Sequence, residues 1–375
     1  MNDNPFILEP YKSKDLFCDR EKETSEIIRY LENGRNITLV SPRRLGKTGL
    51  IYRIFDELSD RKTGFDTFYT DISSSQNIDD FVKLLSESVV STLKQKSRIS
   101  NFFKLLGGIR PILSYDPLSG KPEVSITYRN EDERVFTLKS IFNYLENNNR
   151  KVIVAIDEFQ QIRQYHNIDM EALLRTYIQP LHNVRFLFCG SKKHTMTDIF
   201  SNAKRPFYES TTFYSLKKLD IDIYCNFIIR KFTERGKLIN QEQAKDIILW
   251  TKDHTFYTQA LCNEVFIRSG STIHDKDISE AKNVILRLNE DRFLEIQRLV
   301  TPSQWNLMKA IAKESTLKQP TAQAFLTKYG LGSGAGVLKN LKTLVEKELV
   351  LEENALEGTA YSIYNIFLFR YLEKL

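Results

Sequence analysis

The fold of this chain is decided by the stretch Ile37-Thr38-Leu39-Val40-Ser41-Pro42-Arg43-Arg44-Leu45-Gly46-Lys47-Thr48. Its first four residues form an apolar run that predicts a buried strand, and the apolar residues after Thr48 recur at helical spacing. A turn that contains Pro42 and Gly46 separates the two. Strand, loop and helix in this order are the context in which a phosphate-binding loop occurs.

The loop matches the pattern G-x-x-x-x-G-K-[ST] except at its first position, where serine replaces glycine. Loops of this kind turn backbone N–H groups toward phosphate oxygens, and the second glycine lets the phosphate approach closely. The following helix adds the positive end of its dipole. The lysine provides a cation for the β- and γ-phosphates, and the threonine hydroxyl provides a ligand for Mg²⁺. We therefore expect nucleotide contacts from Ser41, Pro42, Arg43, Arg44, Leu45, Gly46, Lys47, Thr48 and Gly49.

Arg43 and Arg44 fit two interpretations equally well. Their guanidinium groups could contact phosphate or a neighbouring acidic group. They could also form a solvated pair on an exposed loop. The residues of the loop do not separate these interpretations.

A second motif is the apolar run Val152–Ile156, which is followed directly by Asp157 and Glu158. A continuous apolar run predicts a strand that is buried on both faces inside a parallel sheet. Ligands of such sheets bind at the carboxyl ends of the strands. Alone, an acidic strand end is common and weakly informative. Together with the loop around Gly46, it predicts a Mg-ATP site, and we expect loop and acids to face one another across adjoining sheet edges.

The two acids suit different tasks at such a site. An aspartate in this position holds Mg²⁺ directly or through water, which assigns Asp157 and Thr48 to the metal. A glutamate beside it orients and deprotonates the attacking water, which assigns catalysis to Glu158 together with Lys47. Ser191 follows another apolar strand, and it or Lys192 or Lys193 could sense the γ-phosphate. A helix N-cap at Ser191 is an equally good interpretation.

The alternation of strands and helices predicts an α/β fold, in which a parallel P-loop sheet lies between helices. This pattern covers residues 1–215, with a hairpin inserted at about residues 98–130. Helical patterns alone cover residues 216–298. Residues 299–375 combine helices with two short apolar segments that could form a wing, and they resemble a winged helix.

Composition narrows the class of protein. The 375 residues are 41% hydrophobic and 27% charged, as in an ordinary globular protein. No run approaches the ~20 apolar residues of a membrane span, and the first residues lack the order of a signal peptide, so we expect a cytoplasmic protein. The net charge of +6 favours an anionic partner only slightly. The four widely spaced cysteines predict reduced, mostly buried thiols, and the five histidines form no H-E-x-x-H zinc motif.

Four segments resemble the archaeal-type P-loop ATPases that also occur in Bacteroides-like bacteria, a group in the STAND and AAA+ branch. These segments are Phe17–Glu23, Ser41–Thr48, Ile156–Gln160, and Gly190-Ser191 with Arg205–Tyr208. The resemblance covers nearly the whole chain. It implies an ATP-hydrolysing molecular switch with a helical lid at 216–298 and a winged-helix domain at 299–375. It also places Phe17 and Arg20 near the adenine, although Phe17 could instead pack under the sheet.

The sequence departs from this family after Tyr208, where Glu209 and Ser210 stand in place of an arginine. If that arginine acts on the γ-phosphate in relatives, the nearby Arg205 could substitute for it. ATP or ADP binding is therefore better supported than hydrolysis. A nucleotide-dependent interaction platform without hydrolysis, with a protein client or a second copy as partner, stays open as an alternative.

DNA binding is a further alternative, because the helix after the turn of a winged helix can enter the major groove. Here that helix, Val337–Glu348, carries Lys339, Lys342 and Lys347 but also two glutamates. Such mixed charge is a weak basic signature. We therefore favour a regulatory module over a DNA-binding one.

Overall fold

The computed structural model of the chain describes residues 4–9, 11–60, 64–93, 96–106, 112–117, 120, 122–128, 131–166, 168–355 and 358–375. These residues form two compact units. The first, Glu9–Lys218, is called the sheet unit below. The second combines Leu219–Leu375 with the N-terminal residues up to Leu8, and is called the helical unit.

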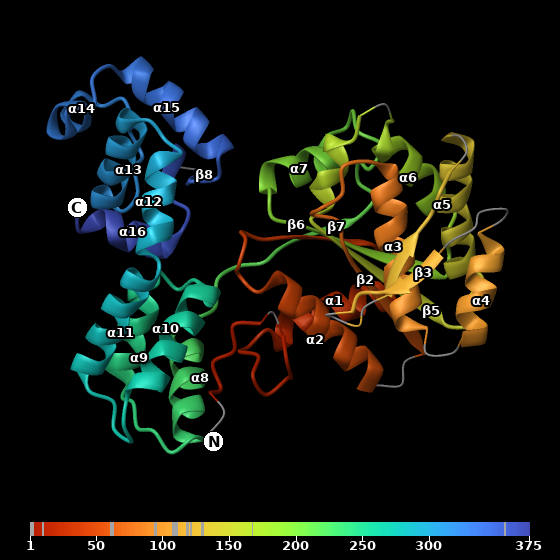
Figure 1. Cartoon of the computed structure of the whole chain (residues 1–375), viewed down its shortest axis with the longest axis horizontal. Coiled ribbons are helices and arrows are strands. Elements are labelled where there is room, and N and C mark those ends of the chain that lie inside the picture. Colours follow the sequence, from red (N-terminus) through yellow and green to blue (C-terminus); the bar gives the residue numbers. More distant parts are fainter. Residues whose placement is uncertain are drawn as a thin grey trace. The chain divides into compact units, whose positions relative to one another are not determined.

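The sheet unit is built on five parallel strands in the order β2-β5-β6-β1-β7. Figure 1 shows this sheet with helices on both sides of it. The bounds of the strands are β1 Ile37–Val40, β2 Phe65–Asp71, β5 Lys151–Asp157, β6 Val184–Gly190 and β7 Thr212–Ser215. The predicted α/β class is confirmed, and β5 lies inside the sheet between β2 and β6. The edge strand β7 was not predicted; it pairs with β1 so that Ile37 lies opposite Thr212.

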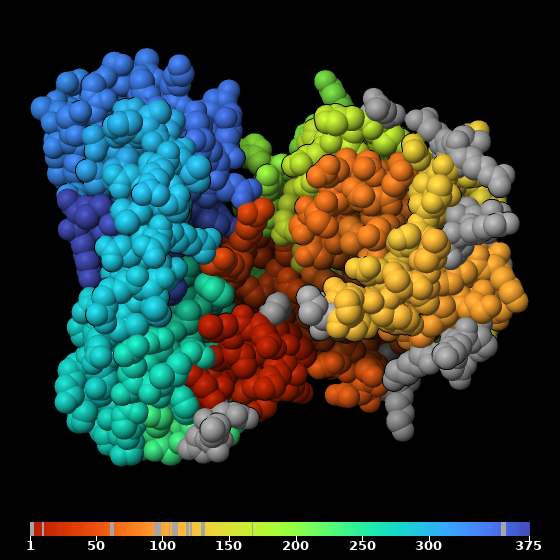
Figure 2. Space-filling view, viewed as in Figure 1, coloured from red at the N-terminus to blue at the C-terminus, as the bar shows by residue number. Residues whose placement is uncertain are grey.

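Successive side chains of a strand point to opposite faces, and both faces of this sheet are apolar. Val152, Val154 and Ile156 of β5 belong to one buried cluster, whereas Ile153 and Ala155 belong to the other. The first cluster includes residues of α3 (Ile78–Thr92), α5 (Glu131–Glu146), α6 (Met170–Ile178) and α7 (Lys193–Ser201). The second includes residues of α1 (Glu21–Glu32) and α2 (Lys47–Asp60). Helices therefore cover both faces, and in Figure 2 their side chains hide most of the sheet.

Residues 98–130 contain more than the predicted hairpin. The strands β3 (Ile112–Tyr115) and β4 (Pro122–Ser125) pair antiparallel, apart from the main sheet. The helix α4 (Lys96–Leu105) precedes them and was not predicted. Residues 107–111, 118, 119, 121, 129 and 130 of this stretch lie outside the described residues.

The helical unit starts with α8 Ile221–Thr233, α9 Gln241–Trp250, α10 Thr255–Arg268, α11 Asp275–Leu288 and α12 Glu290–Arg298. It continues with α13 Pro302–Glu314, α14 Gln323–Tyr329, α15 Gly334–Glu346, β8 Val350–Ala355, β9 Gly358–Ile363 and α16 Ile366–Glu373. The start of α13 follows from its sequence: Thr301 and Gln304 form a reciprocal capping box, and Pro302 occupies the first turn. The division of this unit into a lid and a winged-helix domain at residue 298 stays a prediction.

Residues 4–8 belong to the helical unit, whereas the sequence suggested a domain over residues 1–215. Phe6 is fully buried, and its ring centroid lies 4.7 Å from that of Phe232 on α8. Asn263 of α10 donates its side-chain amide to the Phe6 carbonyl at 2.7 Å, while Asn4 donates to the Asn263 carbonyl at 3.1 Å. The chain therefore passes between the two units twice, after Leu8 and after Lys218.

Two further expectations concern the whole chain. All four cysteines are buried thiols that form no disulfide, as predicted. Within the described ranges, no helix combines the length and the apolar character that crossing a membrane requires.

Replacing Phe6 by alanine should destabilise the helical unit by about 3–5 kcal/mol, because a fully buried ring is lost and a cavity is left. Both tryptophans, Trp250 and Trp305, lie in the helical unit, so urea unfolding followed by tryptophan fluorescence reports on this unit. The matched control is Leu8→Ala, because Leu8 is 53% exposed and its loss should change the midpoint little. Equal effects of the two substitutions would contradict the packing of Phe6.

Candidate functional site

The phosphate-loop motif connects β1 to α2 in the arrangement that the sequence predicts. Gly46 has a φ of 94°, a conformation that side-chain-bearing residues rarely adopt, and its carbonyl accepts from Leu50 to start α2. Leu45 of the loop is buried, and Gly49 is buried within α2. Arg43 and Arg44 are exposed. The first turn of α2 offers N–H groups that have no partner within the helix, as an anion site requires.

Ser41 and Pro42 open the loop without strain. Ser41 is buried, its N–H donates to the Gly190 carbonyl at 3.3 Å, and its φ lies outside the left-handed range. Nothing in this backbone conformation demands glycine. The departure from the motif at its first position is therefore compatible with a normal loop.

Lys47 brings the two motifs together. Its Nζ lies 2.9 Å from Asp157 Oδ1 and 3.0 Å from Glu158 Oε1. Next to it, the Thr48 hydroxyl donates to Asp157 Oδ2 at 2.9 Å. The loop and the acids therefore face one another, as the sequence predicts, although β6 lies between β1 and β5. The long Lys47 side chain at the start of α2 closes this gap, so the predicted groups still meet.

Burial and charge oppose each other at this cluster. Burial alone would lower the pKa of Lys47, but the carboxylates of Asp157 and Glu158 outweigh it and the pKa is raised. Burial alone would raise the pKa of Glu158, but Lys47 and hydrogen bonds from Ser191 and Gln160 outweigh it and the pKa is lowered. Lys47 and Glu158 therefore stay charged at neutral pH.

Glu158 is held in one orientation. Its backbone is left-handed, with a φ of 56°, which turns the chain sharply after β5 into the 3-10 helix η1 (Phe159–Gln164). Its Oε2 accepts from the Ser191 hydroxyl at 2.7 Å and from the Gln160 side-chain amide. Ser191 is thus part of the site, and the alternative of a capping role does not hold, since Lys192 occupies the N-cap of α7.

Sequence reasoning missed two residues of the cluster. The Tyr69 hydroxyl donates to Asp157 Oδ2 at 3.1 Å, and Gln160 contacts Glu158. Gln160 belongs to a segment that the sequence singled out, but nothing in the pattern gave it a task. Tyr69 could not be found, because the sequence does not say that β2 pairs with β5.

The oxygen atoms of Thr48 and Asp157 fit a magnesium ion. They lie 2.9 Å apart, and hydroxyl and carboxylate oxygens are the ligands that Mg²⁺ prefers. In the part of the chain that the structure describes, no group of three or more histidine, cysteine or acidic side chains could hold a metal. Nucleotide sites need no such group, because Mg²⁺ takes one or two protein oxygens and completes its shell with phosphate and water.

Phe17 and Arg20 lie before and at the start of α1. The Phe17 ring packs with the cluster beneath α1 and α2 and meets Tyr11 edge-on, with centroids 5.5 Å apart. Arg20 is buried, pairs with Glu23, and donates to the Lys217 carbonyl at 2.6 Å. The contacts of Phe17 agree with the alternative that its ring packs under the sheet. A contact of Phe17 or Arg20 with adenine stays a prediction.

Arg205 does not stand free to replace the missing family arginine. Its guanidinium lies 3.0 Å from Asp198 and 3.7 Å from the buried carboxylate of Glu171. Arg163 of η1 pairs with the same two acids. This network joins η1 to α6 and α7.

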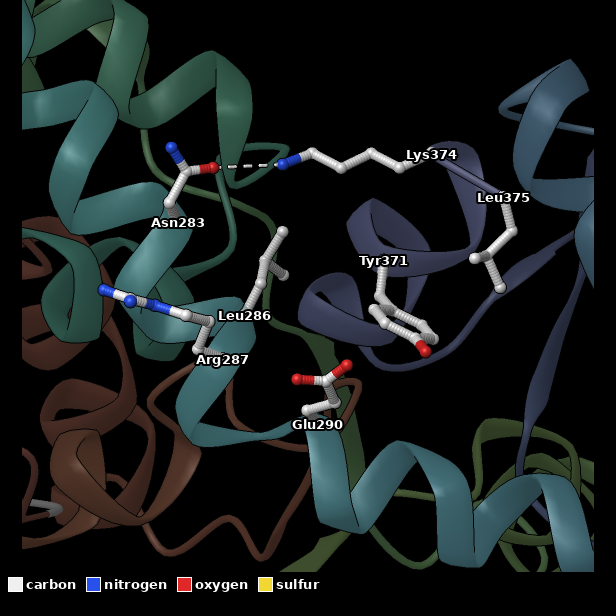
Figure 3. A pocket seen from close by; sticks show the side chains of 7 residues that line it. All are labelled: Asn283, Leu286, Arg287, Glu290, Tyr371, Lys374 and Leu375. Atoms are coloured by element: carbon white, nitrogen blue, oxygen red, sulfur yellow. Dashed lines mark hydrogen bonds between the residues drawn. The ribbon is translucent and has the colours of Figure 1, made fainter.

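A hollow of about 340 Å³ lies elsewhere, in the helical unit, where α11, α12 and α16 meet (Figure 3). Arg287, Glu290 and Lys374 lie at its edge, and Lys374 donates to Asn283 at 3.2 Å. None of the predicted site residues lines it. Its mixed charge selects no ligand class.

Comparison with known proteins identifies the family. Residues 17–252 match the family described as an ATPase domain predominantly from Archaea, which is more than half of the chain. The chain belongs to this family. Residues 291–374 match a second family, described as "Probable winged helix domain". The ATPase resemblance inferred from the four sequence segments is thereby confirmed, as is the winged helix at the C-terminal end.

Solved structures share the fold of this chain at low sequence identity. A Walker-type ATPase of Pyrococcus abyssi is 18% identical with a TM-score of 0.66, over 98% of this chain and 99% of the other. The Aeropyrum pernix ORC2 protein, solved as ADPNP–ADP complexes, is 14% identical with a TM-score of 0.58, over 99% and 97%. The Aeropyrum pernix ORC1 protein in complex with DNA is 13% identical with a TM-score of 0.53, over 99% and 96%. No curated protein sequence matches the chain.

Replacing Lys47 by methionine should destabilise the nucleotide-free sheet unit by roughly 2–3 kcal/mol at pH 7, since the buried carboxylate of Asp157 and the partly buried one of Glu158 lose their counter-charge. Glu158 has a lowered pKa, so its ion pair stabilises the fold above its ordinary value of 4.5 and is lost as the pH falls below it. The penalty should therefore shrink between pH 7 and pH 4.

The measurement is urea unfolding at both pH values, monitored by the hydrogen exchange of peptides from β1 and β5. Lys22→Met is the matched control, because Lys22 is exposed on α1. A penalty that is the same at both pH values would contradict the ion-pair account.

Proposed function

We propose that this chain binds Mg-ATP at the phosphate loop and hydrolyses it slowly, as a molecular switch of the STAND/AAA+ type. One observation carries the proposal: Lys47 and Thr48 of the loop contact Asp157 and Glu158 at the end of β5. A phosphate cradle and two carboxylates at one edge of a parallel sheet are the parts that phosphoryl transfer to water needs. Membership of an ATPase family supports the same chemistry.

The residues would divide the work as follows. Lys47 and the N–H groups of the loop bind the β- and γ-phosphates, and Thr48 and Asp157 hold Mg²⁺. When bound, the ion neutralises charge on the phosphate oxygens. Glu158 accepts a proton from a water molecule while the water oxygen bonds to the γ-phosphorus. The bond between that phosphorus and the bridging oxygen breaks, and ADP leaves with the bonding electron pair.

The switch part of the proposal assigns the predicted segments to moving parts. Residues 216–298 act as the lid, and residues 299–375 act as a winged-helix regulatory module. Phe17 and Arg20 contribute to the adenine side of the site. The absent family arginine and the pairing of Arg205 with Asp198 support slow turnover. They also motivate the alternative of an interaction platform that binds nucleotide without hydrolysing it.

ATP affinity and steady-state turnover of the wild type, Lys47→Ala and Glu158→Gln test the site. Lys47→Ala should weaken ATP binding at least tenfold, because a phosphate-bound cation is lost. Glu158→Gln should bind ATP normally but lose roughly 10²–10⁴-fold in turnover, because the base is lost. Lys22→Ala, on the exposed side of α1, is the control. Unchanged affinity of Lys47→Ala would refute the site, and normal turnover of Glu158→Gln would refute the base.

Single-turnover measurement separates the switch from the platform. Mixing excess protein with ATP and Mg²⁺ should release one phosphate per bound nucleotide. If bound ATP stays intact over hours while its affinity depends on Lys47, the chain is the non-hydrolysing platform.

DNA binding is a second candidate, favoured by the winged-helix match and by the fold shared with a DNA-bound protein. The charges support it poorly. Lys339 and Lys342 are exposed on α15, but Glu352 and Glu353 are exposed on the neighbouring strand β8. Lys347 donates to the Leu299 carbonyl at 2.7 Å. Acidic groups on a wing repel the DNA backbone, so we propose a regulatory role for this module.

A salt titration of duplex binding decides between these roles. We expect negligible affinity for duplex DNA even at low salt, where phosphate contacts are strongest. Tight binding with a steep salt dependence, weakened by Lys339→Ala with Lys342→Ala, would instead establish the DNA role.

A further inference from the structure

Gln160 is a buried amide to which the proposed chemistry assigns no task. It lies in η1, two residues after Glu158, and is only 6% exposed. Its Nε2 donates to Glu158 Oε2, the same oxygen that accepts from the Ser191 hydroxyl. A carboxylate only accepts hydrogen bonds, so the nitrogen of the amide must face it.

The opposite side of the amide is unusual. Gln160 Oε1 is buried and has no hydrogen-bond partner in the described structure. An unsatisfied buried acceptor costs about 1–3 kcal/mol. Burying an apolar side chain here would avoid this cost, so packing alone does not account for an amide at this position. The hydrogen bond to Glu158 is the contact that only the amide provides.

Gly190 makes room for this arrangement at the end of β6. A Cβ atom built on Gly190 would lie 2.5 Å from Gln160 Oε1 and equally close to the Met196 side chain. Any larger residue would push these side chains away. The close approach keeps the amide against the strand end, with its nitrogen toward the catalytic carboxylate.

The two oxygens of Glu158 are therefore unequal. Oε2 accepts from Gln160 and Ser191, whereas Oε1 accepts from Lys47 at 3.0 Å. When Lys47 turns to phosphate, Oε1 loses its donor while Oε2 keeps both of its donors.

We propose that Gln160 is a positioning residue that anchors Glu158 through Oε2 and leaves Oε1 as the oxygen that takes the proton from the attacking water. This inference rests on the proposed function, because it refines the task of Glu158 in hydrolysis.

The test replaces Gln160 by methionine, which keeps the length and removes the donor. Gln161→Met is the matched control on the same element: Gln161 donates to the Ser75 carbonyl at 2.9 Å, away from Glu158. Two readouts are compared, the turnover of ATP as a function of pH and the titration of the Glu158 carboxyl. The titration uses ¹³C NMR of the nucleotide-free protein, with the signal assigned by its loss in Glu158→Gln.

The expected direction follows from the hydrogen bond. A donor to a carboxylate favours its charged form and lowers the pKa, so loss of the Gln160 donor raises the pKa of Glu158. A base that must be ionised then loses activity at a higher pH, and the acid limb of the turnover profile moves upward. In Gln160→Met we expect kcat to fall about tenfold, as for one hydrogen bond to a charged group, with KM for ATP changed less than twofold.

Each outcome decides the matter. An unchanged Glu158 titration in Gln160→Met, even with lower stability, would show a packing role and overturn the inference. An equal rise of the Glu158 pKa in Gln161→Met would also overturn the inference, because the rise would then not depend on the hydrogen bond from Gln160 to Glu158. Absent turnover in the wild type would refute the proposed function, whereas the NMR titration would still decide whether Gln160 sets the state of Glu158.

Discussion

The structure of the site depends on the charge balance among Lys47, Asp157 and Glu158. An ammonium group and two carboxylates are taken largely out of water, which is costly for each of them alone. They are tolerated because Lys47 lies within 3.0 Å of both carboxylates and because neutral donors complete the shell of each carboxylate. A bound triphosphate would substitute for the carboxylates as the partner of Lys47. Binding of nucleotide thus exchanges one set of charge contacts for another.

The rest of the sheet unit positions Lys47, Asp157 and Glu158 for these contacts. Apolar side chains on both faces of β5 fix the strand between two helical layers, which determines where Asp157 emerges. The positive φ of Gly46 directs α2 so that Lys47 reaches across β6. The left-handed backbone of Glu158 and the absent side chain of Gly190 then let Gln160 and Ser191 reach the second carboxylate. The left-handed residues Gly46 and Glu158 thus shape the candidate site.

Sequence patterns predicted those parts of the molecule that local signals encode. The apolar run before Asp157 predicted a buried strand, and the loop pattern predicted Lys47 and Thr48. What the sequence could not reveal depends on long-range pairing. The order of the strands is not encoded locally, so the sequence could not show that Tyr69 lies beside Asp157 or that β6 lies between the two motifs. The short strand β7 has half-exposed and exposed residues and lacks an apolar run, so only its pairing with β1 defines it.

A pair of crystal structures, without nucleotide and with a non-hydrolysable ATP analogue and Mg²⁺, tests the central claim most directly. The quantity to measure is the distance from Lys47 Nζ to Glu158 Oε1, which is 3.0 Å in the structure described above. The account predicts that Nζ leaves Glu158 for the β- and γ-phosphates while Oε2 keeps its contacts with Ser191 and Gln160. A triphosphate bound away from Lys47, or an ion pair that persists unchanged beside it, would contradict the account.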